Sequence, residues 1–427
     1  MIRTSVARSA SPAFVVLTLL FLSAVAVSPA LAGDWKGQIV EKEGLPYVMS
    51  PKDGMEGPVT LELDELWRIG GDTDDEDEFF GVIQRITTDK EGNVYLLDSQ
   101  LSEIKVFSAD GEYLRTIGRE GEGPGEFRRP QDMFFLPDGN LGVLQVAPGR
   151  IVMLSPDGDP VGDHPLPQTE GGETPILVGG QLMGDHILLL FNENKFQEGK
   201  IDIVRGMAMI DSEGQETKRL HSETRTLDFS NTVFDEKTWS TFDRRWSIGL
   251  DGTLYACIQF ADYEVVVWGA DGNKKQVITR EFERRARSEE QMERVHDIFE
   301  AFTRQVPNSS VKVSDFDQDI ALLSPRADGS LWVMNSRGQE DRPDGSLGVF
   351  DVFDRDGHFV REVTLMGEGN PNEDGYFFVG DRLYVVTGFL DAAMAAVGGG
   401  AEDGEDEEEA EPMAVICYQV GPLKAGM

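Results

Sequence analysis

The chain has few cysteines, few histidines and a shortage of basic residues. Its 427 residues include 2 cysteines, 5 histidines and 39 Lys and Arg residues, against 77 Asp and Glu residues, for a formal net charge of −38. Because affinity for nucleic acid depends largely on Lys and Arg that neutralise phosphates, nucleic acid is a poor partner for this chain. Cations, basic partners or a salty habitat fit better, and composition does not choose among them.

Long apolar runs are absent after the N-terminus. The run AFVVLTLLFLSAVAV (13–27) follows Arg3 and Arg8 and precedes ALA (30–32), which has the form of a signal peptidase site. Residues 1–32 are therefore predicted to be a signal peptide, of the general secretory type because no paired arginine precedes the run. A permanent membrane anchor is the alternative, but the run is shorter than the roughly 20 residues that a spanning helix needs. We expect a periplasmic or secreted protein with no transmembrane segment after cleavage.

The two cysteines, Cys257 and Cys417, are 160 residues apart in what we interpret as different sheets. Export would permit a disulfide between them. Free cysteine is often a small core residue, so two buried thiols are the favoured interpretation.

Signatures of common catalytic and phosphate sites are missing as well. No Gly-x-Ser-x-Gly turn occurs, and the glycine-rich loop 118–127 fits neither the dinucleotide fingerprint nor the P-loop. A strand follows that loop, so no helix N-terminus is available to hold a phosphate. The loop is instead expected to carry the chain from one sheet to the next.

Metal-ligand patterns are weak. Asp315, Asp317 and Asp319 resemble the start of a calcium loop, but the glycine and the closing Glu are missing. No cofactor is predicted, with calcium kept as an alternative. The histidines stand alone, not in H-x-H or H-x-x-x-H pairs that favour zinc. They are His164, His186, His221, His296 and His358.

What the chain has in abundance is short strands joined by Asp-Gly turns. VYLLD (94–98) is followed by IKVFSADG (104–111) and YLRTIG (113–118), and the same order returns after residues 133, 246 and 321. Units of about 40–50 residues with four strands predict a β-propeller. Two degenerate units, 173–223 and 375–420, bring the count to six. The predicted fold is therefore an all-β, six-bladed β-propeller with four-stranded antiparallel blades.

The predicted organisation is a signal peptide, an N-terminal extension (33–56) and a propeller (57–427). VTLELDELWRIG (59–70) has no blade of its own and is expected to supply the missing strand of the last blade, closing the ring. One inserted helix is expected in 281–305, where apolar residues recur at helical spacing. The acidic stretch 398–412 is predicted to be a disordered loop.

The stretch VYLLDSQLSEIKVFSADGEYLRTIGREGEGPGEFRRPQDM resembles the NHL repeat, best over residues 82–139. The chain as a whole resembles the bacterial exported six-bladed β-propeller proteins related to NHL propellers. One departure is Ser102-Glu103, where NHL repeats usually carry Asn-Arg. The resemblance implies the fold and leaves the function open, because propellers serve unrelated functions.

Two clusters are candidates for ligand binding, because residues that lead into an inner strand tend to lie near the central channel. Arg and Trp are also frequent binding anchors. Cation–π packing inside the ring is the competing interpretation. The candidates are Arg128, Arg129, Gln131 and Asp132 before blade 2, and Trp239, Arg244, Arg245 and Trp246 before blade 4.

Two functions remain in competition at this point. The first is a non-catalytic binding or scaffold module for a protein, peptide or glycan. The second is a metal-dependent hydrolase or lyase of the lactonase type. Three or four Asp, Glu, Asn or His side chains converging at the channel would favour the enzyme.

Overall fold

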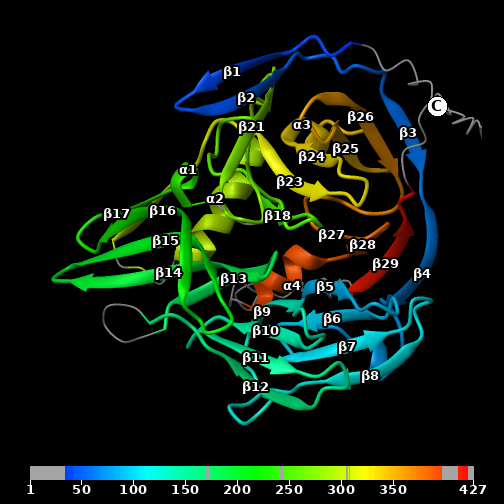
Figure 1. The fold of residues 1–427 in the computed structure, drawn as a ribbon, viewed down its shortest axis with the longest axis vertical. Coiled ribbons are helices and arrows are strands. Elements are labelled where there is room, and N and C mark those ends of the chain that lie inside the picture. The colour runs from blue at the N-terminus through cyan, green and yellow to red at the C-terminus, as the bar shows by residue number, and fades with distance from the viewer. Residues whose placement is uncertain are drawn as a thin grey trace, which may run out of the picture.

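The computed structural model describes residues 34–168, 174–239, 245–303, 306, 308–396 and 412–421. Two expectations, the signal peptide and nearly all of the acidic loop 398–412, lie outside these residues. Six four-stranded antiparallel blades surround a central axis, as predicted (Figure 1). Among the described helices, none combines the length and the apolar character needed to cross a membrane.

The first three blades use consecutive strands, and each blade begins with its inner strand. The strands are β5 (Ile83–Thr88), β6 (Val94–Asp98), β7 (Glu103–Phe107) and β8 (Tyr113–Ile117) in blade 1; β9 (Pro130–Phe135), β10 (Leu141–Gln145), β11 (Arg150–Leu154) and β12 (Pro160–His164) in blade 2; and β13 (Ile176–Met183), β14 (His186–Gln197), β15 (Lys200–Ile210) and β16 (Glu216–Asp228) in blade 3.

The last three blades follow the same plan, except that the final strand of blade 6 comes from the N-terminus. The strands are β18 (Trp246–Ile248), β19 (Leu254–Ala256), β20 (Glu264–Trp268) and β21 (Lys274–Arg280) in blade 4; β23 (Ile320–Pro325), β24 (Leu331–Asn335), β25 (Ser346–Phe353) and β26 (Phe359–Met366) in blade 5; and β27 (Gly375–Val379), β28 (Arg382–Val386), β29 (Ala414–Gln419) and β4 (Asp64–Gly70) in blade 6.

Ring closure by the N-terminal segment is confirmed, with one difference in detail. β4 pairs antiparallel with β29, whereas the first half of the expected segment forms a separate strand, β3 (Val59–Glu62), parallel to β26 of blade 5. Ahead of it, the hairpin of β1 (Gln38–Lys42) and β2 (Leu45–Ser50) adds to the outer strand β21 of blade 4. Residues 38–70, the N-terminal belt, thus cover three blade edges in turn (Figure 1). Edge coverage satisfies backbone groups that would otherwise pair with other chains.

Helices are more numerous than the one that the sequence predicted. That helix is α2 (Glu289–Thr303), and an extended stretch occupies the start of the expected range 281–305. The described residues contain three further α-helices, α1 (Glu236–Trp239), α3 (Ser336–Glu340) and α4 (Phe389–Ala396), and a 3-10 turn, η1 (Glu76–Glu78). A parallel pair, β17 (Thr232–Asp235) and β22 (Ser309–Lys312), joins the segments around α1 and α2. These short helices lack the apolar periodicity that marked α2.

The two faces of the ring differ. In an antiparallel blade, the first and third connections emerge on one side and the second and fourth on the other. The short turns that join the first strand of a blade to the second and the third to the fourth lie on the first side, here called the turn face. All four α-helices interrupt connections of the second kind, so they lie on the opposite side, here called the helical face.

Acidic residues of the turn face are used to shape the turns. Asp89 Oδ1 accepts a hydrogen bond from the backbone N–H of Asn93 (2.8 Å), and the first acidic residue of several other turns does the same. Glycine follows because the chain there needs a positive φ, 88° at Gly92. Part of the strong negative charge therefore serves local structure.

Each interface between blades is filled by apolar side chains from both. Around the closing strand, Ile69 packs with Phe80, Tyr384 and Val415 in a cluster that joins blades 6 and 1. Both cysteines are free and fully buried, Cys417 in this cluster and Cys257 between blades 4 and 5. Burial raises the pKa of each thiol to about 11.

Ile69→Ala tests ring closure by β4. Ile69 is 3% exposed, so we expect a loss of about 2–5 kcal/mol in the free energy of unfolding, measured with urea. Leu66→Ala in the same strand is the control, because Leu66 is 42% exposed and its truncation should change stability by less than about 0.5 kcal/mol. Equal effects from the two variants would contradict the proposed role of β4.

The thiols give a second test. At pH 8 a thiol with a pKa of about 11 is ionised in roughly one molecule in a thousand, and both side chains are also shielded from solvent. The native protein should therefore not react with a thiol-specific disulfide reagent, while the urea-unfolded protein should release two equivalents. Absence of reaction after unfolding would point to a disulfide instead.

Candidate functional site

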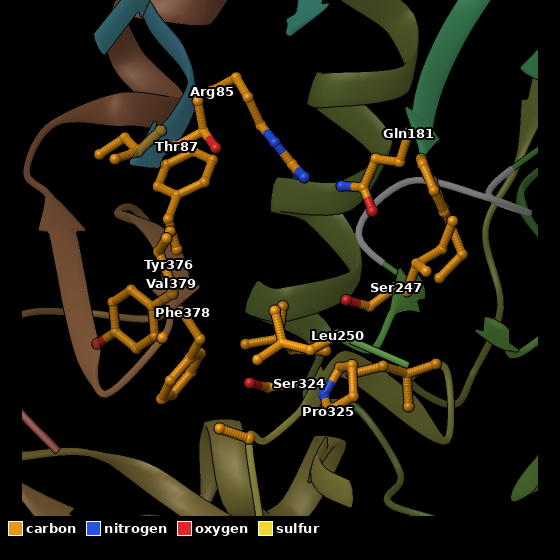
Figure 2. Close-up of a pocket in the computed structure, with 18 residues that line it drawn as sticks. Arg85, Thr87, Gln181, Ser247, Leu250, Ser324, Pro325, Tyr376, Phe378 and Val379 are labelled. Atoms are coloured by element: carbon orange, nitrogen blue, oxygen red, sulfur yellow. The ribbon is translucent and has the colours of Figure 1, made fainter. Parts of the chain in front are cut away.

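The candidate site is a cavity of about 230 Å³ in the central channel, open towards the turn face. Inner strands of blades 1, 3, 4, 5 and 6 line it. Blade 2 contributes through the ion pair between Asp132 and Arg85, described below. Figure 2 shows the lining side chains. The principal ones are Arg85 and Thr87 of blade 1, Gln181 of blade 3, Trp246, Ser247 and Leu250 of blade 4, Ser324 and Pro325 of blade 5, and Tyr376, Phe378 and Val379 of blade 6.

Arg85 is the cation of this cavity, and its charge is balanced by Asp132. Arg85 Nε lies 3.2 Å from Asp132 Oδ1, which links blades 1 and 2. The Asp132 carboxylate also accepts hydrogen bonds from the backbone N–H groups of Gly180 (3.1 Å) and Met133 (2.9 Å). Burial nevertheless raises the pKa of Asp132, while Arg85 opposes that shift. The side chain of Arg85 remains 30% exposed, so part of its guanidinium faces the cavity.

Gln181 reaches towards Arg85 from the other side of the channel. Figure 2 shows the two side chains extending towards each other. Turning the Gln181 amide so that its oxygen faces Arg85 pairs an acceptor with a donor, with Arg85 Nη1 at 3.0 Å. Blades 1, 2 and 3 are therefore joined across the channel by one guanidinium, one carboxylate and one amide.

The rest of the lining combines aromatic and aliphatic surface with hydroxyl groups. Trp246 approaches Gly179 of blade 3 so closely that a Cβ there would lie 3.1 Å from the indole, so a larger residue would have to displace the ring. Ser324 is 3% exposed, and its Oγ has no hydrogen-bond partner among the described residues. Leu250, at the tip of a turn, is 86% exposed beside the opening. Buried polar groups are normally satisfied, so Ser324 is available to a bound molecule.

The predicted cluster before blade 2 is divided by the structure. Asp132 lies at the channel, whereas Arg128 is exposed and ion-paired with Glu122 (2.8 Å). Arg129 is also exposed, and its backbone N–H donates to Ser102 Oγ (3.3 Å). Gln131 is half-buried on β9. Only Asp132 of these four therefore reaches the residues of the cavity.

The cluster before blade 4 is divided in the same way. Trp246 lines the cavity, but Arg245 is 1% exposed and donates to the carbonyl oxygen of Gln259 (2.9 Å) inside blade 4. Trp239 of α1 packs against Phe234 and lies 5.6 Å from the guanidinium of Arg225, which is cation–π packing on the helical face. Arg244 lies outside the described residues.

The carboxylates that resembled a calcium loop are paired with arginines in the structure. Asp317 is held by Arg285 (2.8 Å) and Arg287 (2.6 Å), and Asp319 by Arg284 (3.0 Å), so these carboxylates anchor the arginine-rich stretch before α2. Two small groups of potential ligands occur among the described residues, each with a single histidine and neither at the channel. They are His296 with Asp297 and Glu300, and His358 with Asp354 and Asp356.

Sequence reasoning missed Arg85, Gln181 and Ser324. A weak signal existed for Arg85, which is a lone cation within the inner strand IQRITT. Nothing in the spacing connects it with residues of blades 3 and 5, because the propeller brings these together only when the ring closes.

Arg85→Gln tests the channel ion pair. Without Arg85 the buried carboxylate of Asp132 loses its cation, so the pKa of Asp132 should rise further in the folded state. A carboxyl whose folded pKa is raised loses stability as the pH increases. We therefore expect a deficit of about 1–3 kcal/mol in urea unfolding at pH 7 and a smaller one at pH 4. Asp132→Asn in the same background should restore most of it, and a deficit that did not depend on pH would contradict the pairing.

Comparisons with known proteins agree with this architecture. Residues 72–233 match the model of a protein family described as a 6-bladed beta-propeller. A search of curated proteins gave no match.

Several solved structures resemble the chain at low identity. A candidate exported protein from Bacteroides fragilis is 13% identical, with 86% of this chain and 100% of that chain covered and a TM-score of 0.48. A member of the duf4221 family from Bacteroides vulgatus is 11% identical, covering 84% and 98%, with a TM-score of 0.49. Virginiamycin B lyase from Staphylococcus aureus is 12% identical, covering 75% and 81%, with a TM-score of 0.37. From the blade topology, the chain is a six-bladed β-propeller, and its residues 72–233 are similar to that family model.

Proposed function

We propose that the protein is an exported, non-catalytic binding module, and that its ligand is a protein, peptide or glycan that inserts one group into the channel cavity from the turn face. Export is supported by the signal-peptide pattern of residues 1–32. Of the residues predicted from the sequence, Asp132 and Trp246 would contribute at this site. Arg128 and Arg129 lie in a connection on the helical face and are not part of this proposed site.

The observation that carries the proposal is the chemistry of the lining. It offers a guanidinium, an amide and two serine hydroxyls together with the aromatic side chains of Trp246 and Phe378. Such a mixture of apolar surface and a few polar groups is typical of binding sites. The size points to a large ligand, because about 230 Å³ is below the roughly 300–1,000 Å³ that encloses a whole small molecule. One side chain or one sugar unit of a longer chain fits this description.

The metal-dependent alternative requires a different set of side chains. Divalent metals in propeller-type sites would be held by carboxylates or imidazoles. Within the described lining of the cavity there is no Asp, Glu, Asn or His. Asp132, which lies beside the cavity, is already paired with Arg85. The lining therefore supports binding over metal-assisted hydrolysis.

Leu250→Ser tests the proposed site. The exported fraction of the source cells would be passed over immobilised protein, residues 33–427, and the retained molecules identified by mass spectrometry and sugar analysis. We expect at least one molecule to be retained by the original protein and lost with Leu250→Ser, because Leu250 presents an 86% exposed apolar side chain at the opening. Gln181→Ala, which alters only the channel cavity, should weaken the same retention. Phe79→Ser is the matched control, since Phe79 is 63% exposed but lies in a connection on the helical face.

Retention that Leu250→Ser and Phe79→Ser abolish equally, or that neither abolishes, would contradict binding at the channel. Metal content separates the alternative function. About one equivalent of calcium or zinc retained after dialysis against a weak chelator would favour the enzyme and direct the next assays to lactones and esters.

A further inference from the structure

A second cavity, about 640 Å³, lies on the turn face in the gap between blades 4 and 5. We call it the blade 4–5 groove. It is separate from the channel site, although Leu250, Pro325 and Ala327 border both. Its lining includes Tyr255, Val267 and Gln276 of blade 4 and Arg355 of blade 5. Its volume is within the range of about 300–1,000 Å³ that encloses a small molecule.

The equivalent gap between blades 1 and 2 shows how the repeat normally fills this space. There Tyr95, on the second strand of blade 1, is paired with Thr87 and Val106. Its hydroxyl accepts a hydrogen bond from Arg115 Nη2 (3.2 Å) and lies 3.3 Å from Asp89 Oδ2. Arg115 also donates to the carbonyl oxygen of Pro156, in the turn of blade 2 (2.7 Å). One guanidinium thus occupies the gap and satisfies the tyrosine.

Blade 4 keeps the tyrosine but not the arginine. Tyr255 is paired with Ser247 and Val267, as Tyr95 is with Thr87 and Val106. The register position of Arg115, opposite Val106, is held in blade 4 by Gln276, opposite Val267. The shorter glutamine side chain ends against Gly357, whose added Cβ would lie 3.1 Å from Gln276 Nε2. Among the described residues the Tyr255 hydroxyl has no hydrogen-bond partner. The missing guanidinium therefore opens the groove.

A cation enters the groove from the opposite side instead. Gly158 packs on Ile117 and Gly357 packs on Ile278, so the two turns are equivalent and Arg355 takes the place of Pro156. Arg355 is exposed and donates to the carbonyl oxygen of Asp328 (3.0 Å), but it forms no ion pair with a carboxylate among the described residues. It is close enough to Tyr255 to influence the pKa of the phenol, which burial raises to about 12. The hydroxyl therefore stays protonated and can donate at any physiological pH.

The charge of the lining differs from that of the whole chain. The lining contains three basic side chains and one acidic side chain, namely Lys275, Arg326, Arg355 and Asp251. The whole chain, by contrast, has nearly twice as many acidic as basic residues. Lys275 is paired with Asp271 (3.4 Å), and Arg326 stacks on Trp332 and Phe378 towards blade 6. The guanidinium of Arg355 is thus the charge left for a ligand. Apolar surface from Tyr255, Val267 and Pro325 lies next to it.

We propose that the blade 4–5 groove binds a small oxyanion, a carboxylate or a phosphate, carried on an apolar body. Arg355 holds the oxyanion through its guanidinium, and the Tyr255 hydroxyl donates a second hydrogen bond. A charged donor beside a neutral donor is a common arrangement for recognising such groups. The apolar body lies against Val267 and Pro325. The ligand thereby takes the space that Arg115 fills in blade 1.

Calorimetry with three probes of one ring size tests the proposal. Benzoate presents a carboxylate, phenyl phosphate a phosphate, and benzamide the same ring without charge. At low ionic strength we expect saturable binding of one or both anions by the protein of residues 33–427, weakening as salt is added. The tighter of the two anions identifies the source of the oxyanion. Benzamide should bind at least about tenfold more weakly, because it forms no charge-assisted hydrogen bond.

Three variants locate the binding. Arg355→Gln should weaken binding of the preferred anion by about tenfold or more, and Tyr255→Phe should weaken it by a smaller factor. Gln276→Arg restores the blade 1 arrangement and should abolish binding by filling the groove. Arg119→Gln is the matched control, an exposed arginine elsewhere whose loss should leave binding unchanged. Arg355 is exposed, so its replacement should not disturb folding, and equal melting temperatures would verify this.

Three outcomes would overturn the proposal. They are no saturable binding of either anion, binding of the preferred anion that Arg355→Gln leaves unchanged, and benzamide binding as tight as the preferred anion. Arg85→Gln, which alters only the channel, separates the two sites. It should leave anion binding intact whether or not the channel proposal holds.

Discussion

The pairing of β4 with β29 is the interaction on which the ring depends. Each blade buries both of its faces against its neighbours, so an incomplete sixth blade would expose the cluster of Ile69, Phe80 and Tyr384 to water. The strand that prevents this comes from the opposite end of the sequence. The rest of the N-terminal belt covers the outer edges of blades 4 and 5, where β2 and β3 form hydrogen bonds with the backbone of β21 and β26.

The two faces of the ring differ in structure, because tight turns form one and longer insertions form the other. The turn face is built from tight turns, most of them held by an acidic side chain and two by the hydroxyls of Ser108 and Ser155. The helical face carries the insertions, and the arginine-rich stretch before α2 is tied down by Glu236, Asp317 and Asp319. Both cavities described above open on the turn face, not on the helical face that carries the insertions.

Equivalent positions of the blades share a backbone conformation, and a candidate site arises where the side chain at such a position differs between blades. The tyrosine of the second strand is satisfied in blade 1 by Arg115, but the same residue in blade 4 faces a groove because Gln276 is shorter. Likewise the last residue of the second strand is a buried polar anchor in three blades. Asp98 and Gln145 accept backbone N–H groups from the segments that lead into their own blades, Gln145 from Arg128. Asn335 instead accepts the N–H of Gly338 and caps α3. An identical backbone thus carries side chains that either complete the scaffold or leave room for a ligand.

The sequence by itself determined the blades, their order and the strand that closes the ring. Local sequence patterns predict these features, namely turn glycines at a regular spacing and alternating apolar residues between them. It also placed Asp132 and Trp246 near the channel, since residues at the start of an inner strand lie there. Local signals could not separate Trp246 from Arg245, because adjacent residues of an extended chain point to opposite sides, and Arg245 turned into blade 4. Only the tertiary structure decided that Arg85, Gln181 and Ser324 meet in one cavity and that Gln276 leaves another open. These side chains belong to different blades, and ring closure, not sequence spacing, sets the distances between them.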